Sequence, residues 1–258
     1  MATPEHPPLT RRRIAVAVIL SLVAGFVDVF SFLVLSGVYT ATMSGNTVLI
    51  AVHAAAGEVA TAWLHATTIA AFVSGLMVSS IAIEIGLRRG IARVLALALT
   101  LEATCLAIIA LWGVPLVASG AAGTTLEPRV PLYLLVGLSA IAMGTQNTSL
   151  RMAGILAIFT THVTGTLTRF GEQLVNYGFA LSDQLRRGAV TPAASRPAAS
   201  LHQAAFSAAL WVAFLTGAGA ASTLTPRWGA AAALCLPIAL LALVAGIDLL
   251  RPLAKPRT

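Results

Sequence analysis

Six long apolar stretches constrain the fold of this chain more than any other feature of its sequence. About 20 mainly apolar residues cross the hydrocarbon core of a bilayer as one helix. Charged residues make up only 10% of the chain and are absent from long blocks, whereas a soluble domain carries about 25%. The sequence therefore predicts an all-α, polytopic membrane helical bundle. The six predicted transmembrane helices lie at about 14–35, 66–86, 94–113, 131–150, 204–222 and 228–250.

The positions of the basic residues orient these predicted helices. If the N-terminus is cytoplasmic and six helices cross, all of the 16 Lys and Arg residues except Arg129 and Arg227 fall on the cytoplasmic side. This bias is the one that the positive-inside rule requires. We therefore expect both termini in the cytoplasm and the bilayer as the partner. The net charge of +7 needs no nucleic-acid partner to explain it.

Two polar, small-residue stretches, 40–47 and 160–166, stand between apolar runs and resemble each other. Ser44 corresponds to Thr164 and Gly45 to Gly165. The apolar sequences around them also match in order, because Ala-Phe-Val-Ser-Gly at 71–75 returns as Ala-Phe-Leu-Thr-Gly at 213–217. Each half contains three crossings, an odd number. The sequence therefore predicts two inverted three-helix repeats, each with a broken or re-entrant half-helix. An eight-crossing arrangement, in which both polar stretches span the membrane, is the alternative.

These repeats divide the chain into a short series of segments. They are a cytoplasmic N-terminal tail at 1–13, membrane repeat 1 at 14–113, an outer loop at 114–130, membrane repeat 2 at 131–250 with a cytoplasmic loop at about 178–203, and a cytoplasmic C-terminal tail at 251–258.

The polar stretches are the predicted binding site. Gly45 permits a sharp turn, and Ser44 or Asn46 can then cap a short helix that continues through Val52. Two opposed half-helix N-termini near the midplane suit an anionic or strongly dipolar solute. The alternative is that these polar groups only bond neighbouring helices and fix their packing. The candidate substrate-binding residues are Asp28, Thr42, Ser44, Gly45, Asn46, Thr47, Gln146, Asn147, Thr161, His162, Thr164, Gly165 and Thr166.

Three titratable residues are candidates for proton coupling: Asp28, Glu102 and His162. A carboxylate within a spanning helix costs about 2.5–3.5 kcal/mol on insertion scales, so Asp28 and Glu102 each need a partner or a cavity. Asn147, the counterpart of Asp28 in the second half, cannot titrate. The alternative for each acid is a hydrogen bond to a neighbouring helix.

Three other acidic residues predict interfacial ion pairs: Glu84 with Arg88, Asp248 with Arg251 and Glu172 with Arg169. No group of His, Cys and carboxylates has metal-ligand spacing, and we find no P-loop, dinucleotide fingerprint or nucleophile elbow. We therefore expect no metal and no cofactor, and enzyme activity is not the favoured function.

The expected function is that of a small secondary transporter or channel-like carrier. A second copy of the chain, in a homodimer, is a further candidate partner. One alternative is an accessory subunit of another membrane protein. A less favoured one is an intramembrane enzyme that acts on a lipid or other apolar substrate through Asp28, Glu102 and His162.

Four motifs also resemble those of the YoaK-type family of bacterial multi-pass membrane proteins, which is grouped as a domain of unknown function. The resemblance covers nearly the whole chain and implies a polytopic inner-membrane protein, without an established substrate or catalytic residue. Ser44 stands where that family's pattern suggests Thr. The motifs are Gly25-x-x-Asp28, Thr42-Met43-Ser44-Gly45-Asn46-Thr47, Gly144-Thr145-Gln146-Asn147 and Thr161-His162-Val163-Thr164-Gly165-Thr166.

Overall fold

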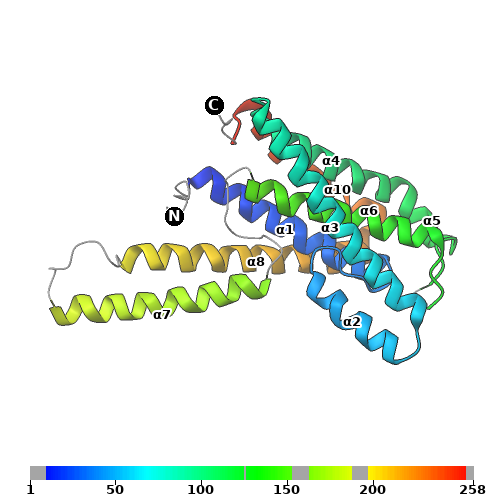
Figure 1. Cartoon of the computed structure of the whole chain (residues 1–258), viewed down its shortest axis with the longest axis horizontal. Helices are drawn as coiled ribbons and strands as arrows, with labels where there is room; N and C mark the ends of the chain where they lie inside the picture. Colours follow the sequence, from blue (N-terminus) through cyan, green and yellow to red (C-terminus); the bar gives the residue numbers. More distant parts are fainter. Residues whose placement is uncertain (1–9, 125, 153–162, 188–196, 254–258) are drawn as a thin grey trace.

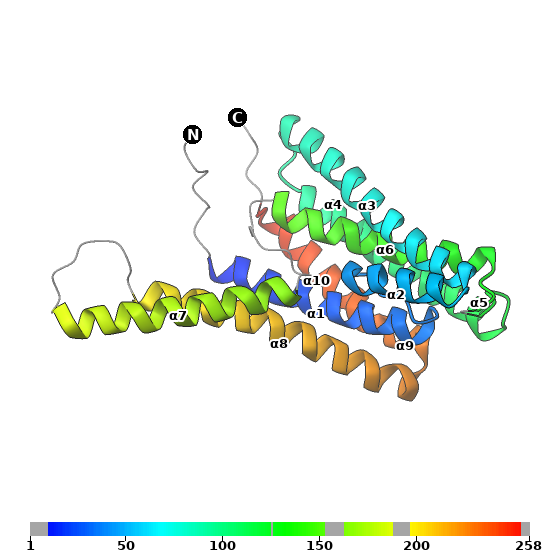
Figure 2. The same cartoon turned by 60° about the horizontal axis from the view of Figure 1, so that its bottom comes forward.

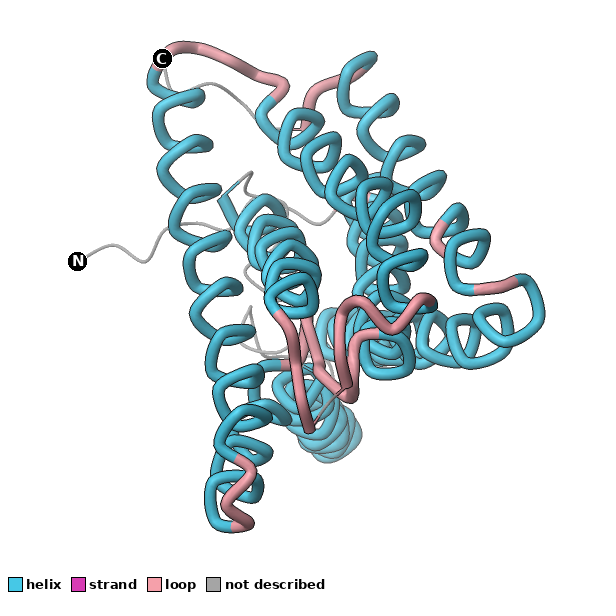
Figure 3. The backbone as a smooth tube through the Cα atoms, turned by 90° about the vertical axis from the view of Figure 1, so that its right-hand side faces the viewer, coloured by secondary structure: helices cyan, strands magenta, loops and turns pink. Residues whose placement is uncertain are grey.

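A computed structural model describes residues 10–124, 126–152, 163–187 and 197–253. Apart from one isolated bridge between Gly123 and Pro128, the regular structure within these ranges is helical (Figure 3). The helices are α1 (Arg11–Val34), α2 (Met43–Ala55), α3 (Val59–Arg88), α4 (Val94–Ile108) with a π-helical turn (Ile109–Gly113) leading into α5 (Val114–Ala118), α6 (Val130–Met152), α7 (Val163–Arg187), α8 (Pro197–Trp228), α9 (Ala230–Ala233) and α10 (Cys235–Leu250).

Five helical stretches of the described chain are long and apolar enough to cross a membrane. They are Arg11–Val34, Val59–Arg88, Val94–Ala118, Ser200–Trp228 and Ala230–Leu250. The prediction of an all-helical chain with several apolar spans is confirmed. Helix α6, which we predicted as a sixth span, is not among the five, and its C-terminal half carries an unbroken polar run at 145–149.

The outer surface of the bundle is apolar and its interior holds polar groups. Met77 is 56% exposed and Trp112 is 72% exposed, whereas Asp28, Asn46 and Glu102 are buried. A soluble protein has the reverse distribution, with charged side chains outside. This arrangement is that of a bundle whose surroundings are lipid, in which ionisable residues face the interior.

Several helices extend further than the apolar stretches that predicted them. Helix α3 begins at Val59 and not near 66, and α8 begins at Pro197 and not near 204. Much of the predicted loop at about 178–203 is helical, because α7 continues to Arg187. Hydropathy measures the apolar length of a segment, and a helix can continue beyond that length with polar residues.

Glycines bring two pairs of helices into backbone contact. Gly25 on α1 and Gly217 on α8 lie at one crossing, and Gly75 on α3 and Gly144 on α6 lie at the other. At each of the four positions a Cβ atom would overlap a backbone carbonyl oxygen of the facing helix. Small residues at such crossings let helix backbones approach closely, which strengthens van der Waals packing in a membrane.

The buried carboxylate of Asp248 ties α10 to the start of α4. It accepts hydrogen bonds from the backbone N–H of Ala96 at 3.0 Å and of Leu253 at 2.8 Å. Asp248 therefore caps the first turn of α4, and the ion pair that we predicted with Arg251 is not among the contacts of the described chain. The predicted pair of Glu84 with Arg88 is confirmed, at 2.8 Å.

Two helices begin beside the middle of the bundle and run to opposite ends. Figures 1 and 2 place α2 toward one end, against α3, and α7 toward the other, along α8. Together α7 and α8 extend past the rest of the bundle. Each of them begins within one of the two polar stretches of the sequence.

The glycine crossings generate a stability prediction with a matched control on one helix. Gly217→Ala places a methyl group on the backbone of α1, whereas a Cβ on Gly219 meets nothing within 4 Å. We expect Gly217→Ala to lower the stability by about 1–3 kcal/mol, as overpacking does. Gly219→Ala should be neutral or stabilising, because Ala favours helix over Gly by about 0.5–1 kcal/mol. Thermal unfolding of the purified protein in detergent measures both, and equal midpoints would contradict the proposed contact.

Candidate functional site

The candidate site is built around the break between α1 and α2. The chain turns sharply at Ser36 and Gly37, whose φ angles are 64° and 76°. The turn that we predicted at Gly45 is wrong, because Gly45 lies in the first turn of α2 without a positive φ. A Cβ on Gly45 would collide with the ring of Tyr39. Glycine is needed here for close approach to an aromatic ring.

Asp28 satisfies the backbone amides at the end of this break. Its side chain is only 3% exposed, and its Oδ1 accepts hydrogen bonds from the N–H of Ala41 at 2.8 Å and of Thr42 at 3.2 Å. Thr42 is the N-cap residue of α2, so the carboxylate lies at the positive end of that helix. A negative charge is favourable there, and amides that would otherwise be unpaired in an apolar interior gain an acceptor.

Asn46 holds the same break from inside α2. Its amide group donates to the carbonyl oxygen of Tyr39, and its Oδ1 accepts from the N–H of Tyr39 at 3.2 Å. The Nδ1 of His65 lies 3.0 Å from the same Oδ1. Because this oxygen can only accept, Nδ1 carries the proton in the neutral His65 ring. The ring of His53 stacks on His65 at 5.3 Å, and its Nδ1 lies 2.6 Å from Glu58.

Three buried hydroxyl groups continue the polar region toward α6. Ser31 on α1 lies 2.9 Å from Thr40 in the break and 3.2 Å from Ser139 on α6, measured between hydroxyl oxygens. Ser139 donates to Thr40 at 3.1 Å. All three side chains are at most 1% exposed. The hydroxyls join α1, the break and α6 without a charged group.

A second polar cluster lies between α4 and α6. The side chains of Glu102 and Gln146 are fully buried, and the Gln146 amide donates to Oε1 of Glu102 at 3.0 Å. Asn147 is buried next to Gln146. Within the described chain, three oxygens here have no hydrogen-bond partner: Oε2 of Glu102, Oε1 of Gln146 and Oδ1 of Asn147.

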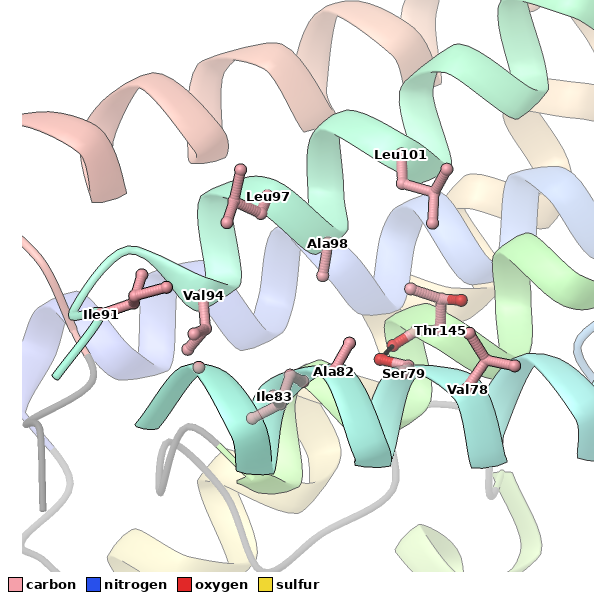
Figure 4. Close-up of a pocket in the computed structure, with 11 residues that line it drawn as sticks. Val78, Ser79, Ala82, Ile83, Ile91, Val94, Leu97, Ala98, Leu101 and Thr145 are labelled. Atoms are coloured by element: carbon pink, nitrogen blue, oxygen red, sulfur yellow. Dashed lines mark hydrogen bonds between the residues drawn. The ribbon is translucent and has the colours of Figure 1, made fainter. Parts of the chain in front are cut away.

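An apolar groove opens between α3 and α4 near this second cluster (Figure 4). It has a volume of about 190 Å³, and side chains such as Ile83 and Leu97 line it from the two helices. Its polar lining residues are Ser79 and Thr145, which hydrogen-bond from hydroxyl to backbone carbonyl at 3.5 Å.

The structure brings together only part of the predicted site. Asp28, Thr42 and Asn46 meet at the break. Ser44 and Thr47 are exposed on the other side of α2, and the Thr47 hydroxyl donates to the carbonyl oxygen of Met43, one turn earlier in the same helix, at 3.0 Å.

The structure describes only part of the second polar stretch. Thr161 and His162 lie outside the described residues. Thr164 and Gly165 are exposed in the first turn of α7, and Thr166 is buried.

Four residues of the site were not predicted from the sequence: Ser31, Tyr39, His65 and Ser139. Ser31 follows Asp28 by three residues, a spacing that places both on one face of a helix, so a signal for it existed. His65 is 1% exposed, and its partner Asn46 comes from a different helix. Nothing in the local sequence marks Ser139, whose role depends on the crossing of α1 and α6.

A family model described as "Protein of unknown function (DUF1275)" matches residues 16–247. The chain belongs to this family. It is also 30% identical over 156 residues to the UPF0700 transmembrane protein YoaK of Bacillus subtilis (strain 168), which confirms the predicted YoaK-type resemblance. That alignment covers 60% of this chain and 64% of the relative, so the chain spans under two thirds of that protein. No solved structure matches.

Asn46 provides a test of the break with a control on the adjacent residue. Asn46→Ala leaves both backbone groups of Tyr39 and the Nδ1 of His65 without their partner. A buried group left unpaired costs about 1–3 kcal/mol, so we expect a clear loss of stability in thermal unfolding. Thr47→Ala removes an exposed hydroxyl and should change stability by less than about 0.5 kcal/mol. Equal effects of the two changes would contradict the role assigned to Asn46.

Proposed function

We propose that this membrane protein is a small secondary transporter or channel-like carrier for a small polar solute. In this proposal six helices, α6 included, cross a bacterial inner membrane as two inverted three-helix repeats, with both termini in the cytoplasm. The observation that carries it is the buried polar region formed by Asp28, Ser31, Thr40 and Ser139, between two helix pairs that glycines lock together.

The reciprocal glycine crossings support the repeat. In the proposed repeat, α1 corresponds to α6 and α3 corresponds to α8. Gly25 and Gly144 then occupy equivalent helices, as do Gly75 and Gly217. Each crossing joins a helix of one half to a helix of the other, which is the pattern that a two-fold relation between the halves requires. The opposite directions of α2 and α7 are consistent with the same relation.

The packing supports movement between two units. One unit contains α1 and α8, the other α3 and α6, and backbone contact at the glycines makes each pair stiff. Between the units, α1 meets α6 through the hydroxyls of Ser31 and Ser139. Hydroxyl groups can exchange partners with water or a solute at little cost. Rocking of one unit against the other would open the polar region first to one side of the membrane and then to the other.

The contacts of Asp28 narrow the class of solute. Its carboxylate already occupies the amides at the start of α2, so an anion at that position would be repelled. The remaining chemistry of the first half consists of hydroxyls, an amide and a carboxylate. These groups suit a dipolar, hydroxylated or amine-bearing solute. In the proposal the described part of the second polar stretch, Thr164, Gly165 and Thr166, also contributes to the pathway, and protons are the coupling ions.

A reversible cross-link across the two units tests the transport mechanism. In a background with Cys105 and Cys235 replaced by Ala, we pair Ser31→Cys with Ser139→Cys, whose hydroxyl oxygens lie 3.2 Å apart in the native chain. Proteoliposomes that contain a pH-sensitive dye are then exposed to amino acids, amines and polyols in turn. We expect solute-dependent proton movement from the reduced protein, a loss of at least tenfold after oxidation, and recovery with reductant.

The two single-cysteine variants are the controls, since oxidation should leave them active. Asp28→Asn should also reduce the flux, because the amide brings no charge to the start of α2. The proposal fails if no solute moves with the background protein, or if the cross-linked protein transports as fast as the reduced one.

A further inference from the structure

We propose that Glu102 and Gln146 form a proton-binding site, in which one exchangeable proton lies between Oε2 of Glu102 and Oε1 of Gln146. This assignment deepens the proposed function, because it names a group that could carry the coupling proton. It also stands without transport, since it describes the state of one pair of side chains.

The geometry begins with the single hydrogen bond between the two side chains. The Gln146 amide donates to Oε1 of Glu102 at 3.0 Å, and both side chains are fully buried. The second oxygen of each group has no partner in the described chain. Oε2 of Glu102 is bound to the same carbon as the accepting Oε1, and Oε1 of Gln146 is bound to the same carbon as the donating Nε2. The two unpaired oxygens therefore lie in the same small region between α4 and α6.

A proton satisfies both oxygens at once. Two acceptors cannot bond each other, and a buried acceptor without a donor is unfavourable. When Oε2 of Glu102 carries a proton it becomes a donor, and Oε1 of Gln146 is the nearby acceptor. The acid and the amide then form a pair with two hydrogen bonds. If the Gln146 amide is turned over, its oxygen faces a carboxyl oxygen, and again only a proton between them relieves the contact.

Among the side chains that the structure describes, none near this pair provides a compensating positive charge. Cys105 lies three residues further on α4, and α10 contributes Asp248, whose oxygens accept from Ala96 and Leu253. On α3 the charged pair is Glu84 with Arg88 at the end of the helix, and the buried His65 bonds Asn46. On α6 the described titratable side chain is the partly buried Tyr133. An isolated carboxylate in an apolar interior becomes neutral by taking up a proton.

The same surroundings favour a proton over a metal ion. Oxygen-ligated cations such as Ca²⁺ take about six to eight ligands, and this pair offers two free oxygens. Within the described residues, no group of three or more His, Cys, Asp and Glu could hold a metal ion.

The site lies against the groove between α3 and α4. Ala98, one helical turn before Glu102, and Thr145, next to Gln146, both line that groove (Figure 4). In the proposal the exchanged proton leaves Glu102 by way of this groove, and the hydroxyl of Ser79 at its polar end is an intermediate hydrogen-bonding group. The exchange forms and breaks only the O–H bond of Glu102, with water as the other proton carrier.

Infrared spectroscopy of the purified full-length protein tests this assignment without any solute. We expect the carbonyl-stretching band of a neutral carboxylic acid at neutral pH, with a downshift in deuterated buffer. Glu102→Gln should remove the equivalent of one neutral carboxyl group per chain. This variant can still form an amide–amide pair with Gln146, so it should fold, and thermal unfolding confirms that it does. Gln146→Leu removes the acceptor and should move the band to higher frequency without removing it.

Two controls separate this site from other acids and from metal binding. Asp28→Asn should leave the Glu102-dependent band unchanged. A spectrum in which Glu102→Gln matches the parent protein would overturn the assignment, as would a band that Na⁺ removes, since the pair would then hold a metal ion. A Glu102-dependent band in a protein that moves no solute would support the proton site and count only against the transporter.

Discussion

The chain break between α1 and α2 depends on one constraint, that backbone amides and carbonyls cannot remain unpaired in an apolar interior. Two side chains meet it. Asp28 accepts from the amides of Ala41 and Thr42, and Asn46 pairs with both backbone groups of Tyr39. With these bonds, a non-helical segment can lie inside the bundle and α2 can begin there. The polar region around Ser31 and Ser139 exists because this break positions Thr40 between them.

The glycine crossings determine where that break lies relative to the other helices. Backbone contact at Gly25 and Gly217 fixes α1 against α8, and contact at Gly75 and Gly144 fixes α6 against α3. Both pairs are internally close-packed, and α1 meets α6 through the small hydroxyl side chains of Ser31 and Ser139. The position of the polar region thus depends on the positions of the glycines at the two crossings. This accounts for buried polar residues on helices that are otherwise apolar.

Features that depend on local composition, such as the helices and the break, could be predicted from the sequence. Contacts that depend on how helices cross could not. The apolar runs predict the helices, and the costly Asp28 and the polar residues at 40–47 predict the break. Gly45 was misassigned to a turn, because a glycine needed for contact with Tyr39 looks the same in sequence as one that needs a positive φ. His65 and Ser139 could not be predicted as site residues, because their hydrogen-bond partners lie outside their own helices. Asp248 was assigned to Arg251 because spacing cannot reveal the backbone amide of Ala96.

The two halves of the proposed repeat differ in their acid chemistry. Asp28 in α1 aligns with Asn147 in α6, so the preceding residue Val27 aligns with Gln146. The first half therefore has a carboxylate held by backbone amides, which are fixed donors. The second half has an amide at that position, and beside it Gln146 meets Glu102, an acid with only one donor. Val27 cannot form the equivalent pair. Both acids belong to repeat 1, and the scaffold would thus separate their tasks: Asp28 holds structure within its own half, whereas Glu102 exchanges its proton where it meets Gln146 of the other half.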